Sequence, residues 1–182
     1  MTIQNDANVH EGTLVDAELG YQIQQFYFRE AELLDEQRFA DWLEVFDEDL
    51  TYWAPLHTNR LRRQAALAVG SPGEAAYFDE TKESLAWRIR RYDSGMAWAE
   101  DPPSRTNHLI SNVLARQTGE NEYTVRTNFL VYRNRLMHEV DLYSGHRIDS
   151  VRRDEAGEFK VFNRVIHFDA NVLMAKNLST FF

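Results

Sequence analysis

Apolar side chains in the first part of the chain recur every three or four positions, which is the spacing of helices laid against a core. The first predicted helix runs from about Leu14 to Leu34, and a second follows almost at once. The two apolar stripes consist of Leu19, Ile23, Phe26, Tyr27 and Leu34, and of Phe39, Trp42, Leu43 and Phe46. Asp35 is placed to cap the second helix, because its carboxylate can accept from the free N–H groups of a first turn.

Alternation of apolar and polar positions from Leu50 to Leu56 predicts a strand. Within it, Pro55 indicates an edge position or a strand end, because proline cannot donate to a ladder. Asn59 to Ala76 is then a long connection that contains two glycines and a proline, and connections of this length are usually functional or mobile. A third helix is predicted from Asp79 to Tyr92.

The period changes to two after the Pro102-Pro103 pair, where four long alternating runs follow one another. The runs are Thr106–Arg116, Glu122–Asn134, Met137–Arg152 and Glu158–Phe168. Turn signals separate the first two and the last two, so the runs predict an antiparallel meander. The residues expected to face inward are Val125, Phe129, Val131, Val140, Leu142, Ile148, Phe162, Ile166 and Phe168.

Three helices followed by a meander predict an α+β fold, in which the helices cover the concave face of a strongly curved, mainly antiparallel sheet. The length of 182 residues favours one domain. We expect residues 14–182 to form it. Residues 1–13 have neither the basic start nor the apolar core of a signal peptide, and we expect them to be a flexible N-terminal arm.

Charge and composition narrow the possible partners and chemistry. The net charge of −9 argues against a nucleic-acid or anionic-membrane partner, because phosphate binding needs a basic field. The chain has no cysteine, which excludes disulfides, thiolate metal ligands and a cysteine nucleophile on it. No apolar run approaches the ~20 residues of a membrane span. Together these features predict a soluble cytoplasmic protein.

Histidines on the predicted strands raise the question of a metal site. The residues concerned are His108, His138, His146 and His167, with Glu139, Asp141 and Asp169 nearby. Two histidines and a carboxylate on neighbouring strands could form a facial iron site. No pair has an established ligand spacing, however, and His138 and His146 would lie about 26 Å apart on an extended strand. We therefore predict no metal site on this chain.

A pocket inside the curved sheet gives two alternative functions. A cone closed by helices often encloses a pocket, and one histidine with one aspartate there could abstract a proton beside a carbonyl, as in small isomerases and dehydratases. The candidates are His108, His146, Asp141 and Asp149. The same pocket could instead bind an apolar ligand without chemistry. The sequence has no nucleophile elbow and no glycine-rich phosphate loop.

Aromatic and arginine residues predict a docking surface, because protein interfaces are enriched in both. The segment Arg88–Asn112 combines Trp98, a rigid proline corner and four arginines. We expect Phe182 to insert into a neighbouring subunit, with packing on its own sheet as the alternative. The full set of side chains expected at subunit interfaces is Trp98, Asp101, Pro102, Arg105, Tyr52, Trp53, Arg90 and Phe182.

Several stretches together resemble one protein family. They are FYFREAELLD at 26–35, YWAPL at 52–56, TNR at 58–60, FDET at 78–81, RIR at 88–90, WAEDPPSR at 98–105, HLISNV at 108–113, YRNR at 132–135 and LSTFF at 178–182. In this order they resemble the small (beta) subunit of bacterial Rieske-type aromatic-ring-hydroxylating dioxygenases. The biphenyl, toluene and cumene branch is more similar than the naphthalene branch.

The resemblance implies a cone-shaped fold of the nuclear-transport-factor-2-like (SnoaL-like) type, which agrees with the helices and meander predicted above. It also implies a hexamer of three large (alpha) and three small (beta) subunits. The large subunits would carry a Rieske [2Fe-2S] cluster and a mononuclear non-haem iron, and a ferredoxin and a reductase would deliver electrons from NADH. This chain would hold no cofactor and no catalytic residue, and would trimerise and hold the large subunits.

Overall fold

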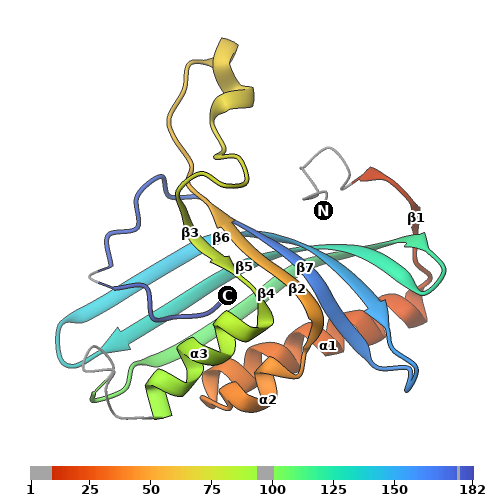
Figure 1. Ribbon diagram of the computed structural model, residues 1–182, viewed down its shortest axis with the longest axis horizontal. Helices are drawn as coiled ribbons and strands as arrows, with labels where there is room; N and C mark the ends of the chain where they lie inside the picture. The colour runs from red at the N-terminus through yellow and green to blue at the C-terminus, as the bar shows by residue number, and fades with distance from the viewer. Residues whose placement is uncertain (1–9, 94–100, 176) are drawn as a thin grey trace.

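The computed structural model describes residues 10–93, 101–175 and 177–182. One seven-stranded sheet has the strand order β1-β4-β5-β6-β7-β2-β3, and the helices lie against its concave side (Figure 1). The meander consists of β4 (Arg105–Gly119), β5 (Glu122–Arg135), β6 (Glu139–Arg153) and β7 (Phe159–Phe168), and the α-helices are α1 (Ala17–Asp35), α2 (Phe39–Leu43) and α3 (Lys82–Asp93). The predicted α+β fold with a curved, mainly antiparallel sheet is confirmed.

Helix α1 begins at Ala17 because Asp16 caps it: the carboxylate of Asp16 accepts a hydrogen bond of 2.9 Å from the amide of Leu19. The cap predicted for α2 is wrong. Helix α2 has no side-chain cap, and Asp35 ends α1, where its carboxylate binds His108 on β4 instead. The stripe predicted for the second helix is also split, because α2 stops at Leu43 and Phe46 opens the next strand.

Strand β2 (Phe46–Pro55) lies between β7 and the short strand β3 (Ala76–Glu80). It runs parallel to β7 and antiparallel to β3, so the sheet is mixed at this side. Pro55 is the last residue of β2, as a strand-end proline should be. Two short strands were not predicted: β3, and β1 (Thr13–Leu14), which pairs Thr13 with Gln117 inside the expected N-terminal arm.

The inward face of β6 is the opposite of the predicted one. Val140, Leu142 and Ile148 all lie on the outer face, where Val140 and Leu142 are exposed and Ile148 is buried. Tyr143, Arg147 and Asp149 point inward and are buried. The apolar alternation of β6 predicts the wrong face because its two inward charged residues, Arg147 and Asp149, are paired with charges of other elements inside the cone. The inward positions predicted on β5 are confirmed, as are Ile166 and Phe168 on β7. The prediction for Phe162 is wrong, because its side chain packs on the outer face under Arg152.

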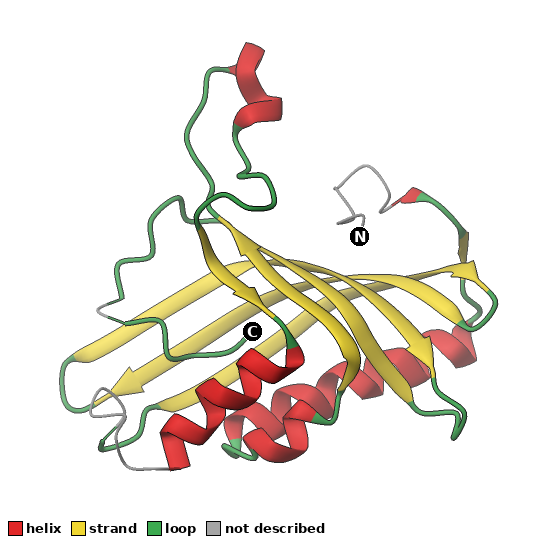
Figure 2. Ribbon diagram, viewed as in Figure 1, coloured by secondary structure: helices red, strands yellow, loops and turns green. Residues whose placement is uncertain are grey.

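The long connection after β2 projects away from the body of the molecule (Figure 2). It carries a short 3₁₀ helix at Arg62–Leu67, and its two stems are held together where His57 pairs with Val69. Exposed arginines occupy positions 60, 62 and 63 of this excursion. None of the helices in the described part of the chain is long and apolar enough to cross a membrane.

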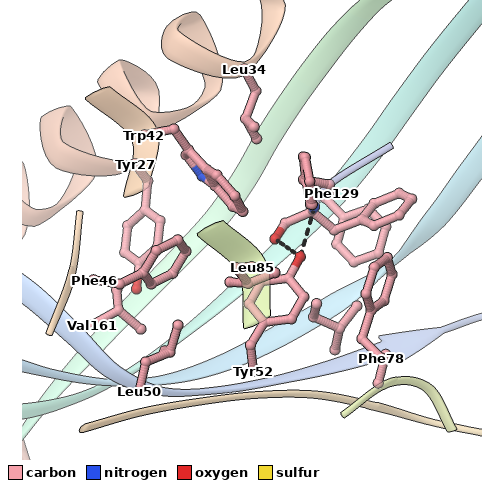
Figure 3. Close-up of a cluster of buried hydrophobic side chains, with 14 of the residues drawn as sticks. Tyr27, Leu34, Trp42, Phe46, Leu50, Tyr52, Phe78, Leu85, Phe129 and Val161 are labelled. Carbon is pink, nitrogen blue, oxygen red and sulfur yellow. Dashed lines mark hydrogen bonds between the residues drawn. The ribbon is translucent and has the colours of Figure 1, made fainter. Parts of the chain in front are cut away.

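Aromatic rings fill the space between the sheet and the helices. Trp42, Phe46 and Tyr52 meet edge to face, and Tyr52 meets Phe78 in the same way at 5.5 Å (Figure 3). Gly145 on β6 lets this core close, because a Cβ there would fall 2.8 Å from the ring of Phe129 and 2.0 Å from the carbonyl oxygen of His167.

Candidate functional site

Four charged side chains, which we call the buried quartet, occupy the inside of the cone: Glu30 from α1, Arg147 and Asp149 from β6, and Arg164 from β7. Each is at most 2% exposed. The guanidinium of Arg164 lies between the two carboxylates, with its Nη2 2.7 Å from Asp149 Oδ2 and 3.1 Å from Glu30 Oε2. Arg147 completes the set with its Nη1 3.2 Å from Glu30 Oε2. The quartet is therefore neutral and mutually paired.

The electrostatics of the quartet follow from this pairing. Burial alone would raise the pKa of Glu30, but Arg147 and Arg164 outweigh it and lower that pKa to about 2. Burial would likewise lower the pKa of Arg164, but Asp149 and Glu30 outweigh it and raise that pKa above its usual range. The phenol of Tyr27 donates to Asp149 at 2.9 Å, and burial together with this carboxylate raises the pKa of the phenol. Glu30 thus stays a carboxylate, Arg164 a cation and Tyr27 a neutral phenol.

Acid should remove the contribution of Glu30 to the free energy of unfolding. Its pKa is lower in the folded chain than in the unfolded one, so its stabilisation is present above about pH 4.5 and is lost as the pH falls toward about 2. We expect urea unfolding at several pH values to show a loss on the order of 3 kcal/mol over this window. The variant Glu30→Gln should be less stable at neutral pH and should lack this part of the acid dependence. An identical acid profile in the variant would contradict the assignment.

Phe182 fills the recess beside the quartet. Its ring is within contact of four other aromatic rings, at 4.8 Å from Phe168, 5.2 Å from Tyr143, 5.6 Å from Phe129 and 6.3 Å from Phe78. The hydroxyl of Tyr52 donates to the main-chain oxygen of Phe182 at 2.7 Å and accepts from its amide at 2.9 Å, as the dashed lines of Figure 3 show. Arg164 donates to the same oxygen at 3.0 Å. The chain thus occupies the recess with its own residue.

The candidate acid–base residues are not brought together. His108 points into the cone, but both of its ring nitrogens are engaged by Asp35 and by the carbonyl oxygen of Phe181. Asp149 belongs to the quartet and Asp141 pairs with Arg133 at 2.8 Å. His146 alternates with the inward Arg147, so it lies on the outer face, where its ring stacks on His167 at 4.8 Å. No His–Asp pair of this set faces an open pocket.

The other histidines are likewise not brought together as metal ligands. His138 lies in the exposed turn between β5 and β6. On the outer face His57 and His167 form a hydrogen bond of 3.0 Å between their rings. Among the residues that the structure describes, no three His, Asp or Glu side chains lie together as a ligand set.

The expected interface residues fall into two groups. Asp101, Pro102, Arg105 and Arg90 are exposed, and Trp98 lies outside the described residues. Residues Tyr52, Trp53 and Phe182 are at most 3% exposed within the chain itself. Within the single chain, these three side chains have almost no exposed surface. Within the chain, Phe182 packs on its own sheet, which is the alternative given above.

The buried quartet is the feature that the sequence-based prediction missed. A signal was present: Glu30 lies three residues after Tyr27 within the apolar stripe of α1, at a position that should face the core. Arg147 and Asp149 are two residues apart, so they share one face of a strand. Charged residues at core positions of two elements indicate a buried ion cluster, because an unpaired buried charge is too costly.

Helices on the concave side of a curved sheet define the cone-shaped, nuclear-transport-factor-2-like class of α+β proteins. Solved structures show the same fold. The structure of naphthalene 1,2-dioxygenase with indole bound matches with a TM-score of 0.81 at 24% identity, over 92% of this chain and 88% of that one. ActVI-ORFA from Streptomyces coelicolor matches with a TM-score of 0.59 at 17% identity, over 84% of this chain and 98% of that one.

The chain belongs to the family of ring-hydroxylating dioxygenase beta subunits, whose model, described as ring hydroxylating beta subunit, matches residues 29–175. It is 42% identical to the chlorobenzene dioxygenase subunit beta of Cupriavidus sp. (strain PS12), over 92% of this chain and 91% of the relative. It is 41% identical to the biphenyl 2,3-dioxygenase subunit beta of Rhodococcus jostii (strain RHA1), with the same coverage. It is therefore a component of an oxidoreductase complex and not itself the catalytic subunit.

Proposed function

We propose that this chain is a structural subunit, which trimerises and holds three large subunits in a circular assembly. This assembly adds both atoms of O₂ to the ring of an aromatic substrate. The large subunits would carry the Rieske [2Fe-2S] cluster and the mononuclear iron, and a ferredoxin and a reductase would supply electrons from NADH in the cytoplasm. The absence of cysteine from the sequence supports placing the cluster on the partner. The histidines of the described residues, spread over both faces of the sheet, support placing the mononuclear iron there as well.

The observation that carries this proposal is an exposed apolar surface on the outer face of the sheet. We call it the outer apolar patch, and it consists of Leu109, Leu130, Tyr132, Val140 and Leu142, each between 38% and 64% exposed. Leu109 pairs directly with Leu130, and Tyr132 with Leu142, so the side chains are neighbours across β4, β5 and β6. A contiguous apolar surface of this kind marks a protein contact.

The patch adjoins the exposed residues expected at the interface. Asn134 pairs with Val140 on one side and with Arg105 on the other, and the Nη2 of Arg105 lies 2.5 Å from Asn134 Oδ1. Arg135 then ties this edge to the proline corner, because its guanidinium donates to the main-chain oxygens of Asp101 and Pro102 at 3.1 Å each. An apolar centre beside a polar, arginine-containing border is the anatomy of a protein interface.

The same observations do not favour the two alternative functions. An isomerase or dehydratase needs an open pocket with convergent acid–base groups, and a module for an apolar ligand needs an empty recess. In this chain the quartet and Phe182 occupy the interior, whereas the apolar surface faces outward.

Assembly tests the proposal. Light scattering of this chain co-expressed with its large chain should give a mass near three copies of each. A stable dimer that ignores the large chain would contradict the proposal.

Charge placed on the outer apolar patch should weaken assembly. The double variant Val140→Glu, Leu142→Glu buries two carboxylates in the proposed contact, and we expect the association to weaken at least about thirtyfold, as for a hot spot worth about 2 kcal/mol. Its own fold should be unchanged, since exposed substitutions alter stability by only about 0.5 kcal/mol. Tyr21→Glu, at an exposed position of α1 on the other layer, is the matched control and should assemble normally. Equal assembly of both variants would show that the outer apolar patch is not part of the interface.

A further inference from the structure

The side chain of His108 on β4 makes two contacts, one through each nitrogen of its ring. The ring Nδ1 lies 2.5 Å from Asp35 Oδ1, at the end of α1, and the ring Nε2 lies 3.0 Å from the main-chain oxygen of Phe181. The amide of His108 also donates to the second carboxylate oxygen of Asp35 at 2.9 Å. The imidazole therefore bridges the end of a helix and the segment 177–182.

Both partners of the ring are acceptors. A carbonyl oxygen can only accept, and an ionised carboxylate can only accept. Burial alone would raise the pKa of Asp35, but the hydrogen bonds from His108 outweigh it and hold that pKa below its usual value, so Asp35 is ionised. A neutral imidazole has one N–H and one lone pair, and the lone pair would face an acceptor in either tautomer. Only the imidazolium satisfies both contacts.

The surroundings are compatible with a cation at this place. The side chain of His108 is 3% exposed, and its carboxylate partner is 26% exposed. Arg133 on the adjacent strand β5 pairs at 2.8 Å with Asp141, which lies on β6 one strand further along, and Arg133 also donates to Ser104. This second pair is neutral as a whole, so Asp35 remains the counter-ion of His108.

The contact to Phe181 holds the segment that fills the cone. The ring of Phe181 packs on Trp42 at 4.8 Å and on Phe39 at 5.7 Å. The next residue is Phe182, whose ring occupies the recess described above. We propose that His108 is held as an imidazolium and, in that form, latches residues 177–182 into the cone as a protonation-dependent plug. A neutral ring would keep its proton on Nδ1, because the carboxylate of Asp35 is the stronger acceptor. Removal of the proton from Nε2 then sets a lone pair against the main-chain oxygen of Phe181, and so loosens the segment. This inference does not depend on the proposed assembly.

Nuclear magnetic resonance of the full chain labelled with ¹⁵N-histidine tests the protonation state directly. At about pH 7, where a free histidine is mostly neutral, both ring nitrogens of His108 should carry a proton. The variant His108→Gln identifies the signals by their disappearance. One protonated and one unprotonated ring nitrogen at this pH would overturn the proposal.

Amide hydrogen exchange of the 177–182 peptide tests the latch. After correction for the intrinsic rate, protection should fall about tenfold or more between about pH 7 and about pH 10, because a charge-assisted hydrogen bond is lost. His108→Gln should be poorly protected at every pH and should lack this dependence. His138→Gln, which changes an exposed histidine in the β5–β6 turn, is the matched control and should keep the wild-type profile.

Two results would separate a latch from a merely structural residue. Protection that is lost in His108→Gln but does not vary with pH in the wild-type chain would overturn the proposal, since the ring proton would then have no role. Protection that varies with pH equally in His108→Gln would overturn it as well, because another group would be responsible.

Discussion

The variant Arg164→Leu should be less stable than the wild-type chain by about 3–5 kcal/mol, which is the cost of removing one partner from a buried ion pair. The guanidinium of Arg164 is fully buried and binds Asp149, Glu30 and the main-chain oxygen of Phe182. Without it, Arg147 is the one cation of the quartet left for two buried carboxylates, and its ion pair is with Glu30. This loss is a large fraction of the 5–15 kcal/mol by which a domain is usually stable. Urea unfolding followed by circular dichroism measures it.

Two further variants make the test specific to burial and charge. Arg152→Leu also removes two ion pairs, to Asp47 and Asp49, but these are partly exposed and should cost only about 0–1 kcal/mol. Adding Asp149→Asn to Arg164→Leu makes the remaining pair, Glu30 with Arg147, neutral again and should recover part of the loss. Equal costs for Arg164→Leu and Arg152→Leu would contradict the idea that the quartet is a buried, mutually dependent cluster.

The variant Phe182→Ala should lose about 3–5 kcal/mol as well, but for a different reason. It removes an aromatic ring from among four others and leaves a cavity that the strands of the sheet cannot close. The main-chain hydrogen bonds to Tyr52 remain possible, so the segment should still enter the cone. Thermal unfolding of the variant and of the wild-type chain gives the difference.

An added aromatic compound separates this cavity from a general loss of order. Benzene should raise the unfolding temperature of Phe182→Ala by binding the folded state alone, and should leave the wild-type chain unchanged because Phe182 occupies the recess. Met174→Ala, at an exposed position between β7 and this segment, should neither lose stability nor respond to benzene. A response of the wild-type chain to benzene would show that the recess is accessible and would revive the ligand-binding alternative.

The elements with strong periodicity were predictable from the sequence. The stripe on α1 and the four alternating runs of the meander lie close to the observed helices and strands because each buries one regular face. Strand β3 was missed, since its five residues run directly into the cap of α3, where Thr81 and Ser84 bond each other. The helix predicted from Asp79 overlaps the last residues of β3, so the sequence pattern does not indicate so short a strand.

The face of β6 and the contents of the cone were not predictable in the same way. Val140 and Leu142 alternate like core residues but are exposed; in the proposed assembly another chain would cover them, and a single sequence does not contain that chain. Arg147 and Asp149 alternate like solvent-facing residues, but Glu30 and Arg164 neutralise them from elements distant in the sequence. Periodicity reports that two faces differ, whereas the identity of the inner face depends on these long-range pairs.

The parallel pairing of β2 with β7 has a consequence for the time at which the chain can fold. Thr51 pairs with Asn163, so one edge of β2 has no neighbour until almost the whole chain has been synthesised. Contacts so distant in sequence form slowly and leave unpaired strand edges exposed in the meantime. Strand β2 therefore cannot complete its pairing until β7 has been synthesised. In the proposed assembly, each ring would then be built from chains whose synthesis had passed β7.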